Sequence, residues 1–300
     1  MTTRVILDCD PGHDDALAIV LAARNLDLRA ITTVAGNQTL AKTTLNARRM
    51  CTVAGITDVP IAAGCDRPLA QEPLIAAGIH GETGLDGPEF PEPTVAEDPR
   101  GALEVAMAVL TEPTTIVATG PLTNVAKLLE RGTDNVQRIV LMGGSTGRGN
   151  MAPLAEFNIL ADPEAADIVF RSGVPITMCG LDVTHQALAT EEVLGRIAAE
   201  DTPLARICHQ LLTFFAGTYR EVFGFEAPPV HDPVAVAAVI DPTIIGVRPV
   251  NVEIELTGTY TRGATVVDLH RVTGRQPNAS VATELDVARF WDLMIDAITR

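Results

Sequence analysis

A segment near the start of the chain, DCDPGHDD at residues 8–15, carries four carboxylates within eight positions. It overlaps the end of the apolar run Val5–Cys9, which predicts a buried strand. Ligands of an open α/β sheet bind at the carboxyl ends of its strands, so aspartates at such an end are candidate ligands. Asp8 and Asp10 share side-chain parity on an extended chain. After the Pro-Gly turn, Asp14 and Asp15 fall in the first turn of a predicted helix, where free N–H groups and the helix dipole stabilise anions.

Four neighbouring carboxylates repel one another when charged, and a bound cation removes that cost. The donors of residues 8–15 are oxygens, without a cluster of thiolates or imidazoles. Such donors select a hard ion: Ca²⁺ accepts many carboxylate and carbonyl ligands in flexible geometry, whereas Mg²⁺ demands a tight octahedron. The segment therefore predicts a site for a divalent cation. The alternative is that one or two of these aspartates only cap the helix.

Three further polar segments could complete such a site. HDP at 231–233 opens the helical run Val234–Ile240, where its aspartate could bind a cation or only cap the helix. EFN at 156–158 follows GN at 149–150, and an extended backbone would point the glutamate and the second asparagine the same way. TGPLTN at 119–124 is typical of a strand-to-helix turn that presents a backbone carbonyl or N–H groups.

Composition excludes several classes of partner. The formal net charge is −16, which argues against binding to nucleic acid and to anionic membrane surfaces, because both need basic residues. The five cysteines are widely spaced and form no CxxC pair, which is typical of free thiols in a reducing compartment. The N-terminus lacks a signal-peptide pattern, and the apolar runs are shorter than the ~20 residues that a spanning helix needs. We therefore expect a soluble cytoplasmic protein.

Short β-branched runs alternate with helical patterns through most of the chain. This alternation predicts an open α/β fold with a mostly parallel, Rossmann-like central sheet flanked by helices. No shift in composition marks a second domain, so we expect one domain over residues 1–300. The expected strands are Val5–Cys9, Ala30–Val34, Thr115–Thr119, Ile139–Met142 and Ile176–Cys179. The expected helices are Asp14–Arg24, Leu40–Ala54, Ala102–Leu110, Leu122–Glu130 and Pro163–Arg171.

The C-terminal third predicts a hairpin and a closing helix. Val250–Leu256 and Ala264–Leu269 flank a Gly/Thr-rich turn, and Glu284–Ile298 is helical in pattern. Two stretches are typical of functional loops: Ala76–Pro93, rich in glycine and proline around a histidine, and Phe214–Pro229, rich in aromatic residues. The alternative for the second stretch is a helix that packs its aromatic face on the core.

Taken together, these pieces resemble the inosine–uridine nucleoside hydrolases. The resemblance is carried in the family's order over essentially the whole chain by DCDPGHDD at 8–15, AGNQT at 35–39, HGETGLDG at 80–87, TGPLTN at 119–124, LMGG at 141–144, AEFNI at 155–159, DPEAA at 162–166, GLDVTH at 180–185 and HDP at 231–233. It implies the nucleoside hydrolase fold, one Ca²⁺ at the floor of the pocket, and hydrolysis of the N-glycosidic bond of ribonucleosides in nucleoside salvage.

The resemblance also implies roles for individual residues. In such enzymes the metal is held by positions that match Asp10, Asp15, Asp232 and the main-chain carbonyl of Thr119. The ribose is held by positions that match Asp14, Asn150, Glu156, Asn158 and Asp232. Asn37 and Met142 match further pocket positions, Phe157 lies between two ribose contacts, and Asp8 matches a supporting residue.

Cleavage of this bond develops positive charge on the ribose and negative charge on the base. Carboxylates beneath the sugar stabilise the cation, and Ca²⁺ orients the diol and lowers the pKa of a bound water, whose proton Asp10 is placed to remove. The departing base needs a proton, for which His231 is the natural donor because its pKa lies near neutrality. His80 could contact the base or lie in a surface loop, and Tyr219 or Phe223 could stack on the base. The other four histidines are expected to be structural.

The substrate preference depends on weaker signals. The loop HGETGLDGPEFPEPT and the late segment TGRQPNASV look most like the branch of the family that prefers uridine and cytidine. The single tryptophan, Trp291, lies in the last helix, away from both loops. A purine-preferring or non-specific hydrolase is the alternative. The resemblance further implies a homo-oligomer, a tetramer or a dimer.

Two other classes of protein compete with this interpretation. A haloacid-dehalogenase-like phosphohydrolase also begins with a strand and DxD, but here Pro11-Gly12 and a double aspartate follow. A calcium-binding module without catalysis would need the acidic cluster, but not Glu156, Asn158 and His231 around it.

Overall fold

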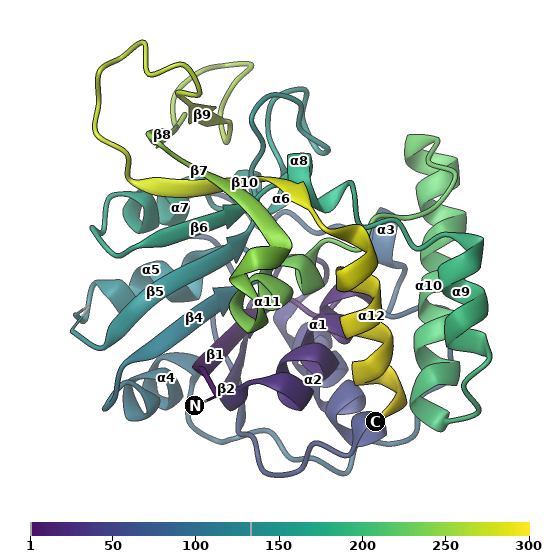
Figure 1. Cartoon of the computed structure of the whole chain (residues 1–300). Coiled ribbons are helices and arrows are strands. Elements are labelled where there is room, and N and C mark those ends of the chain that lie inside the picture. The colour runs from purple at the N-terminus through teal and green to yellow at the C-terminus, as the bar shows by residue number, and fades with distance from the viewer. Residues whose placement is uncertain (1, 133) are drawn as a thin grey trace.

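The computed structural model describes residues 2–132 and 134–300, and their centre is an eight-stranded sheet (Figure 1). Neighbouring strands are parallel except at one edge, where β7 runs antiparallel to β10, so the predicted fold class is confirmed. Across the sheet the order is β3 (Ile61–Ala63), β2 (Asp27–Thr33), β1 (Arg4–Cys9), β4 (Thr114–Ala118), β5 (Val136–Met142), β6 (Ile176–Cys179), β10 (Ala279–Leu285) and β7 (Ile245–Val250).

The strand order reverses beside β1. The chain first builds outward through β2 to β3, and then returns to place β4 on the other side of β1. At such a reversal the loops that leave the two neighbouring strands diverge, and a crevice opens at their carboxyl ends. The turns that follow Cys9 and Ala118 therefore border the natural binding crevice of this sheet.

Alternating side chains of the strands feed two separate hydrophobic cores. Val5 and Leu7 of β1 belong to one core, and Ile6 belongs to the other, as the two-residue period of a strand requires. The first core packs under α1 (His13–Asn25), α2 (Leu40–Ala54), α11 (Asp232–Ile240) and α12 (Val287–Thr299). The second packs under α4 (Ala102–Val109), α5 (Thr123–Leu129) and α7 (Pro163–Phe170).

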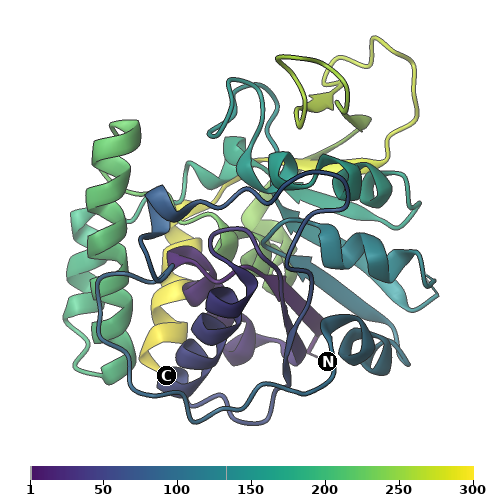
Figure 2. The ribbon, with the colours of Figure 1, turned by 180° about the vertical axis from the view of Figure 1, so that it is seen from behind.

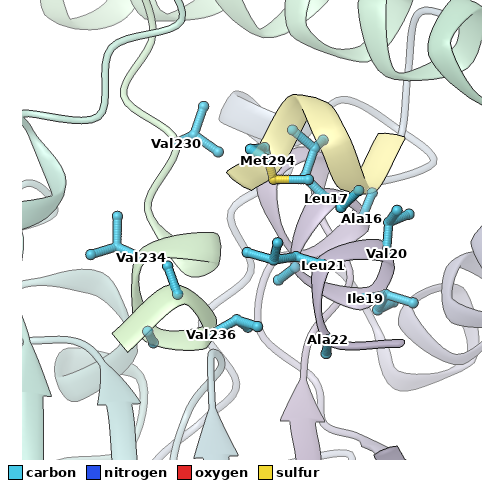
Figure 3. Close-up of a cluster of buried hydrophobic side chains, with 14 of the residues drawn as sticks. Ala16, Leu17, Ile19, Val20, Leu21, Ala22, Val230, Val234, Val236 and Met294 are labelled. Atoms are coloured by element: carbon cyan, nitrogen blue, oxygen red, sulfur yellow. The ribbon is translucent and has the colours of Figure 1, made fainter. Parts of the chain in front are cut away.

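Helix α1 is buried on all sides over its first three turns. Every residue from His13 to Ala22 is buried, because the helix lies between the sheet, α11 and α12 (Figure 3). Leu17 and Leu21 of α1 belong to the same core as Val234 of α11 and Met294 of α12. An all-round apolar helix of this kind is held rigidly, and it carries the aspartates of its first turn with it.

Short helices and one helical hairpin surround the carboxyl ends of the strands. They are α3 (Ala77–His80), α6 (Phe157–Ala161), α8 (Leu181–Thr184), α9 (Glu191–Ala198) and α10 (Pro203–Phe223), with one 3-10 turn, η1 (Pro242–Ile244), elsewhere. Helices α9 and α10 pack against each other at one side of the molecule (Figure 1).

The prediction of a loop from Phe214 is wrong for residues 214–223, because these residues form the last turns of α10. The side chain of Thr202 caps the start of this 21-residue helix, and Gly224, in the left-handed conformation, ends it. Phe215 and Tyr219 are buried on its inner face, so the alternative of a helix that packs its aromatic side is confirmed.

The C-terminal expectations are met in part. The predicted hairpin is present as β8 (Val252–Ile254) paired with β9 (Thr265–Val267). The closing helix begins at Val287, where Asp286 caps it through the N–H of Arg289; Glu284 and Leu285 instead end β10. The expectation of a helix from 284 is therefore wrong by three residues, because the alternating pattern ASVATEL continues the strand.

The segment between α2 and α4 is mostly irregular and crosses the front of the molecule in Figure 2. Within it the predicted loop Ala76–Pro93 begins with the short helix α3 and then turns sharply. Asp86 closes that turn by accepting hydrogen bonds from the N–H groups of Glu82 (2.9 Å) and Thr83 (3.0 Å). In the part of the chain described here, no helix has both the length and the apolar character needed to cross a membrane.

Candidate active site

A pocket opens at the carboxyl ends of β1, β4 and β5, at the crevice that the strand order predicts. It encloses about 480 Å³ of empty space including its open mouth, within the usual range for small-molecule sites. Twelve of the fourteen predicted site residues line it: Asp14, Asn37, His80, Thr119, Met142, Asn150, Glu156, Phe157, Asn158, Tyr219, His231 and Asp232. The remaining two, Asp10 and Asp15, are fully buried and hydrogen-bonded to Asn37 of this lining.

Asp10 has one satisfied and one unsatisfied carboxylate oxygen. Its Oδ2 accepts a hydrogen bond of 2.7 Å from the backbone N–H of Asn37. Its Oδ1 is buried and has no hydrogen-bond partner among the described residues. An ionised oxygen without a partner in the interior is costly unless a cation or a proton meets it. This orphaned oxygen fits a metal ligand.

Asp14, Asp15 and Asp232 form a compact group of carboxylates. One oxygen of each lies within 4.8 Å of the others, although Asp232 comes from the start of α11 and the other two from the start of α1. Asp15 is held by the N–H of Gly12 (3.0 Å), the amide of Asn37 (3.1 Å) and the hydroxyl of Thr119 (2.8 Å). The two helix starts therefore bring together an oxygen donor set that could hold a hard cation.

Burial raises the pKa of every carboxyl group of this cluster. Burial and the neighbouring negative charges raise the pKa of Asp10 and of Asp232, and they raise that of Asp14 to about 7, whereas burial alone raises the pKa of Asp15. Without a counter-charge these groups cannot all ionise near neutral pH. A divalent cation would restore their charged forms, so the electrostatics also fit a metal site.

Thr119 connects the carboxylate group of Asp14, Asp15 and Asp232 to Asn158 on the opposite side of the pocket. Its hydroxyl donates to Asp15, and its main-chain carbonyl accepts a 2.8 Å hydrogen bond from the side-chain amide of Asn158. A carbonyl oxygen has a second lone pair, so this hydrogen bond leaves room for one further contact.

Asp8 does not converge with Asp10, as their shared parity would suggest. It accepts hydrogen bonds from the hydroxyl of Thr32 (2.5 Å) and the amide of Asn124 (2.8 Å), on the side of the second core. The reason is that β1 ends at Cys9, so the two-residue alternation stops before Asp10. Burial raises the pKa of Asp8 to about 6.

Glu156 caps the short helix α6 from inside the pocket wall. Its carboxylate accepts from the backbone N–H groups of Asn158 (2.9 Å), Ile159 (3.2 Å) and Gly144 (2.9 Å), and burial raises its pKa to about 7. The amide of Asn158 also reaches the carbonyl of Met142 (3.1 Å). These bonds tie the end of β5 to α6 and hold both polar side chains in place.

His231 is buried between two hydroxyl groups. Its Nε2 lies 2.8 Å from the Oη of Tyr219, and its Nδ1 lies 2.8 Å from the Oγ1 of Thr184. Burial lowers the pKa of His231 to about 3 and raises that of Tyr219 well above its usual value. The expected near-neutral pKa of His231 is therefore wrong, because burial disfavours the charged imidazolium. The backbone N–H of His231 also donates to Asp14 (3.2 Å). Thr184 was not singled out from the sequence, and no local pattern connects it with His231.

His80 contacts a histidine that we expected to be only structural. Its Nδ1 lies 3.2 Å from the Nδ1 of His13, whose Nε2 donates to the carbonyl of Asp86 at 2.8 Å. Phe215 stacks on both rings. The predicted loop position of His80 is thus buried rather than on the surface.

Four apolar side chains of the pocket were given no role from the sequence: Ala76, Ile79, Met151 and Phe215. One of them had a usable signal, since Phe215 lies four residues before Tyr219 on the same helix face. The others are apolar residues in irregular segments, which carry no such period.

Comparison with known proteins gives a consistent result. The family model described as "Inosine-uridine preferring nucleoside hydrolase" matches residues 5–292. The chain is 48% identical to the pyrimidine-specific ribonucleoside hydrolase RihA of Shewanella woodyi, over 99% of this chain and 98% of that protein. It is also 48% identical to the protein of the same name from Escherichia coli O17:K52:H18, over 99% of both chains.

Solved structures agree with this fold. The purine-preferring ribonucleoside hydrolase from Gardnerella vaginalis superposes with a TM-score of 0.92 at 32% identity, covering 99% of this chain and 98% of its own. The plant nucleoside hydrolase PpNRh1 superposes with a TM-score of 0.92 at 31% identity, covering 100% of this chain and 99% of its own.

Proposed function

The chain belongs to the inosine–uridine preferring nucleoside hydrolase family, and from this premise we propose that it hydrolyses the N-glycosidic bond of pyrimidine ribonucleosides, uridine and cytidine, to ribose and free base. The observation that carries the proposal is one pocket in which buried carboxylates and a buried histidine–tyrosine pair lie together. The phosphohydrolase and calcium-module alternatives account for only part of this arrangement.

We propose Ca²⁺ as the cation, held by Asp10, Asp15, Asp232 and the carbonyl of Thr119. The support is the orphaned Oδ1 of Asp10, the all-oxygen donor set and the raised pKa values of the carboxyl groups. When bound, the cation would neutralise these carboxylates and polarise the hydroxyl oxygens it meets.

The remaining polar groups are assigned to the ribose and the attacking water. Asp14, Asn150, Glu156 and Asn158 would hold the hydroxyl groups of the ribose, and the negative side chains would stabilise the positive charge that develops on the sugar. Asp10 would accept the proton of the attacking water. Asn37, Met142 and Phe157 would complete the walls around the sugar.

The leaving base meets the opposite side of the pocket. His231, through its hydrogen bond to Tyr219, and His80 are the groups that can donate to a base on which negative charge develops. Phe215 and Phe223 supply aromatic faces beside Tyr219, against which a pyrimidine ring could stack.

The preference for pyrimidines is supported by the names of relatives that are 48% identical over nearly the full length. The fold does not decide it, since a structural neighbour with a TM-score of 0.92 is named purine-preferring. A purine-preferring enzyme is therefore the alternative outcome of the test.

A panel of nucleosides tests the proposal directly. We expect kcat/KM to fall in the order uridine and cytidine, then inosine and adenosine, with 2′-deoxyuridine lowest, because a missing 2′-hydroxyl leaves buried polar groups unpaired, a loss on the order of 10⁴-fold. Exhaustive chelation should abolish activity, and added Ca²⁺ should restore it. Inosine cleaved ahead of uridine would overturn the base preference, and no release of ribose from any nucleoside would overturn the activity.

Three broader expectations remain predictions: one domain over residues 1–300, a cytoplasmic role in nucleoside salvage, and assembly as a homo-oligomer.

A further inference from the structure

A buried hydroxyl lies behind the histidine of the proposed leaving-group site. Thr184 is the last residue of α8, is fully buried, and does not line the pocket. Its Oγ1 lies 2.8 Å from the Nδ1 of His231, and the Nε2 of the same ring lies 2.8 Å from the Oη of Tyr219. Thr184, His231 and Tyr219 therefore form a chain that ends at the pocket wall.

The hydrogen bonds that connect Thr184, His231 and Tyr219 could run in either direction. A neutral imidazole has one N–H donor and one nitrogen acceptor, so each direction corresponds to one tautomer of His231. With the proton on Nδ1, His231 would donate to Thr184 and accept from Tyr219. With the proton on Nε2, it would accept from Thr184 and donate to Tyr219.

Only the second direction satisfies the threonine. Among the residues that the structure describes, the hydroxyl of Thr184 has no hydrogen-bond partner except His231. If it accepted from Nδ1, its own proton would be buried without an acceptor, which native structures avoid. If it donates to Nδ1, every proton of the chain has a partner except that of Tyr219, which lines the pocket.

We propose that Thr184 is a positioning residue that holds the proton of His231 on Nε2, so that the hydrogen bonds run from Thr184 through His231 to Tyr219 and present the Tyr219 hydroxyl as a donor to the leaving base. This inference rests on the proposed ribonucleoside hydrolysis. Hydrogen bonds in such a row polarise one another, so the bond from Nε2 strengthens the tyrosine as a donor where negative charge develops on the base.

Two substitutions separate the role of the hydroxyl from that of the packing. Thr184→Val removes the donor and keeps the shape, whereas Thr184→Ser keeps the donor. With Ca²⁺ present, we expect Thr184→Val to lower kcat for uridine about tenfold, the effect of one lost hydrogen bond in the transition state, with KM little changed. The comparison substrate is a nitrophenyl riboside, an activated riboside whose leaving group needs no hydrogen-bond donor. Thr184→Val should cleave it at the wild-type rate. Thr184→Ser should retain kcat for uridine within about threefold.

Nitrogen NMR of the protein labelled with ¹⁵N-histidine reads the tautomer itself, with a His231→Asn spectrum to assign the signal. We expect His231 to be protonated on Nε2 in the wild type and in Thr184→Ser, and to lose that preference in Thr184→Val. An Nδ1-protonated His231 in the wild type would overturn the inference, and so would equal losses for Thr184→Val on both substrates. If the wild type cleaves no ribonucleoside, the proposed function fails, while the tautomer still decides the direction of the chain.

Discussion

At the scale of single residues, the two carboxylate oxygens of the buried Asp10 have different surroundings. One of its oxygens has a backbone partner and the other has none among the described residues, and burial together with the charge of Asp15 raises its pKa. The proposed binding of Ca²⁺ and the proposed catalysis need Asp10 to be charged. Without Ca²⁺, the folded protein would be more stable if this buried carboxylate were replaced by a neutral group.

Asp10→Asn should accordingly have effects of opposite sign. We expect it to abolish calcium binding, measured by calorimetric titration, and to lower kcat/KM for uridine by at least about 10³-fold. In calcium-free protein it should raise the free energy of unfolding by roughly 1 kcal/mol or more, because a buried carboxylate no longer has to be ionised or protonated. Urea unfolding in chelator measures the second effect.

Asp98→Asn is the matched control, since Asp98 is partly buried, pairs with Arg100 and does not line the pocket. It should leave calcium affinity and turnover unchanged. A calcium-free Asp10→Asn protein that is less stable than the wild type would contradict the account of a strained, uncompensated carboxylate.

His231 allows a second prediction at this scale. His231→Ala should lower kcat for uridine by roughly 10²–10⁴-fold, the usual range for help in protonating a leaving group, because it breaks the row of hydrogen bonds that ends at the Tyr219 hydroxyl. It should change turnover of the nitrophenyl riboside much less, because a good leaving group needs no proton. Steady-state rates on the two substrates measure the difference. Equal losses on both would mean that His231 only shapes the pocket.

At the scale of elements, the turn between β4 and α5 lies close against Asp10. A Cβ built on Gly120 would lie 2.7 Å from the Oδ1 of Asp10 and 2.9 Å from Val34. The turn can therefore approach the cation site closely only because residue 120 has no side chain.

Gly120→Ala should displace Asp10 and weaken calcium binding by at least about tenfold, as expected when a ligand of a rigid site shifts. Gly101→Ala, at the start of α4, is the matched control: its Cβ would meet its nearest neighbour at 3.8 Å, an ordinary contact. Calcium titration of both proteins makes the comparison. The same loss in both would show that the effect comes from general destabilisation, not from the turn.

At the scale of the whole molecule, buried ionisable groups connect the stability of the protein to pH. Burial raises the pKa of the carboxyl groups of the site but lowers that of His231 to about 3 and that of His13 to about 4. Raised carboxyl pKa values make stability fall as pH rises, whereas lowered histidine pKa values make it fall as pH drops. The free energy of unfolding as a function of pH is therefore a sum of opposing contributions. The contribution of one group is measured as the difference between the wild type and a variant that lacks that group.

Glu156 is suited to that measurement because it is not among the proposed metal ligands. Its pKa rises from 4.5 to about 7 on folding, so the folded state binds a proton in this interval that the unfolded state has released. Its contribution to stability is complete below about pH 4.5 and is lost as pH rises to about 7. Relative to the wild type, Glu156→Gln should therefore gain free energy of unfolding between pH 5 and pH 8.

Urea unfolding of both proteins at the two pH values, with and without Ca²⁺, gives this difference. Ca²⁺ at about 100 times its Kd should stabilise both proteins by about 2.7 kcal/mol without removing the difference. If the free energy of unfolding depends on pH in the same way in the wild type and in Glu156→Gln, Glu156 keeps an ordinary pKa.

The sequence by itself determined those features that a few neighbouring residues specify. Apolar runs and their periods predicted the parallel sheet, and the acidic segment at a strand end predicted the carboxylate cluster. The resemblance of the motifs to a known family supplied most of the twelve predicted residues that line the pocket. Such signals are local, because burial of one face and capping of one helix end depend on residues only a few positions apart.

Only the tertiary structure decided which partners these residues meet. His231 reaches Asp14 across 217 positions, His13 meets His80 across 67, and Thr184 meets His231 across 47. Asp8 turns away from Asp10 because β1 ends between them. These contacts depend on how α1, α8 and α11 pack on the sheet, and packing is set by the shape of the whole core rather than by any local pattern.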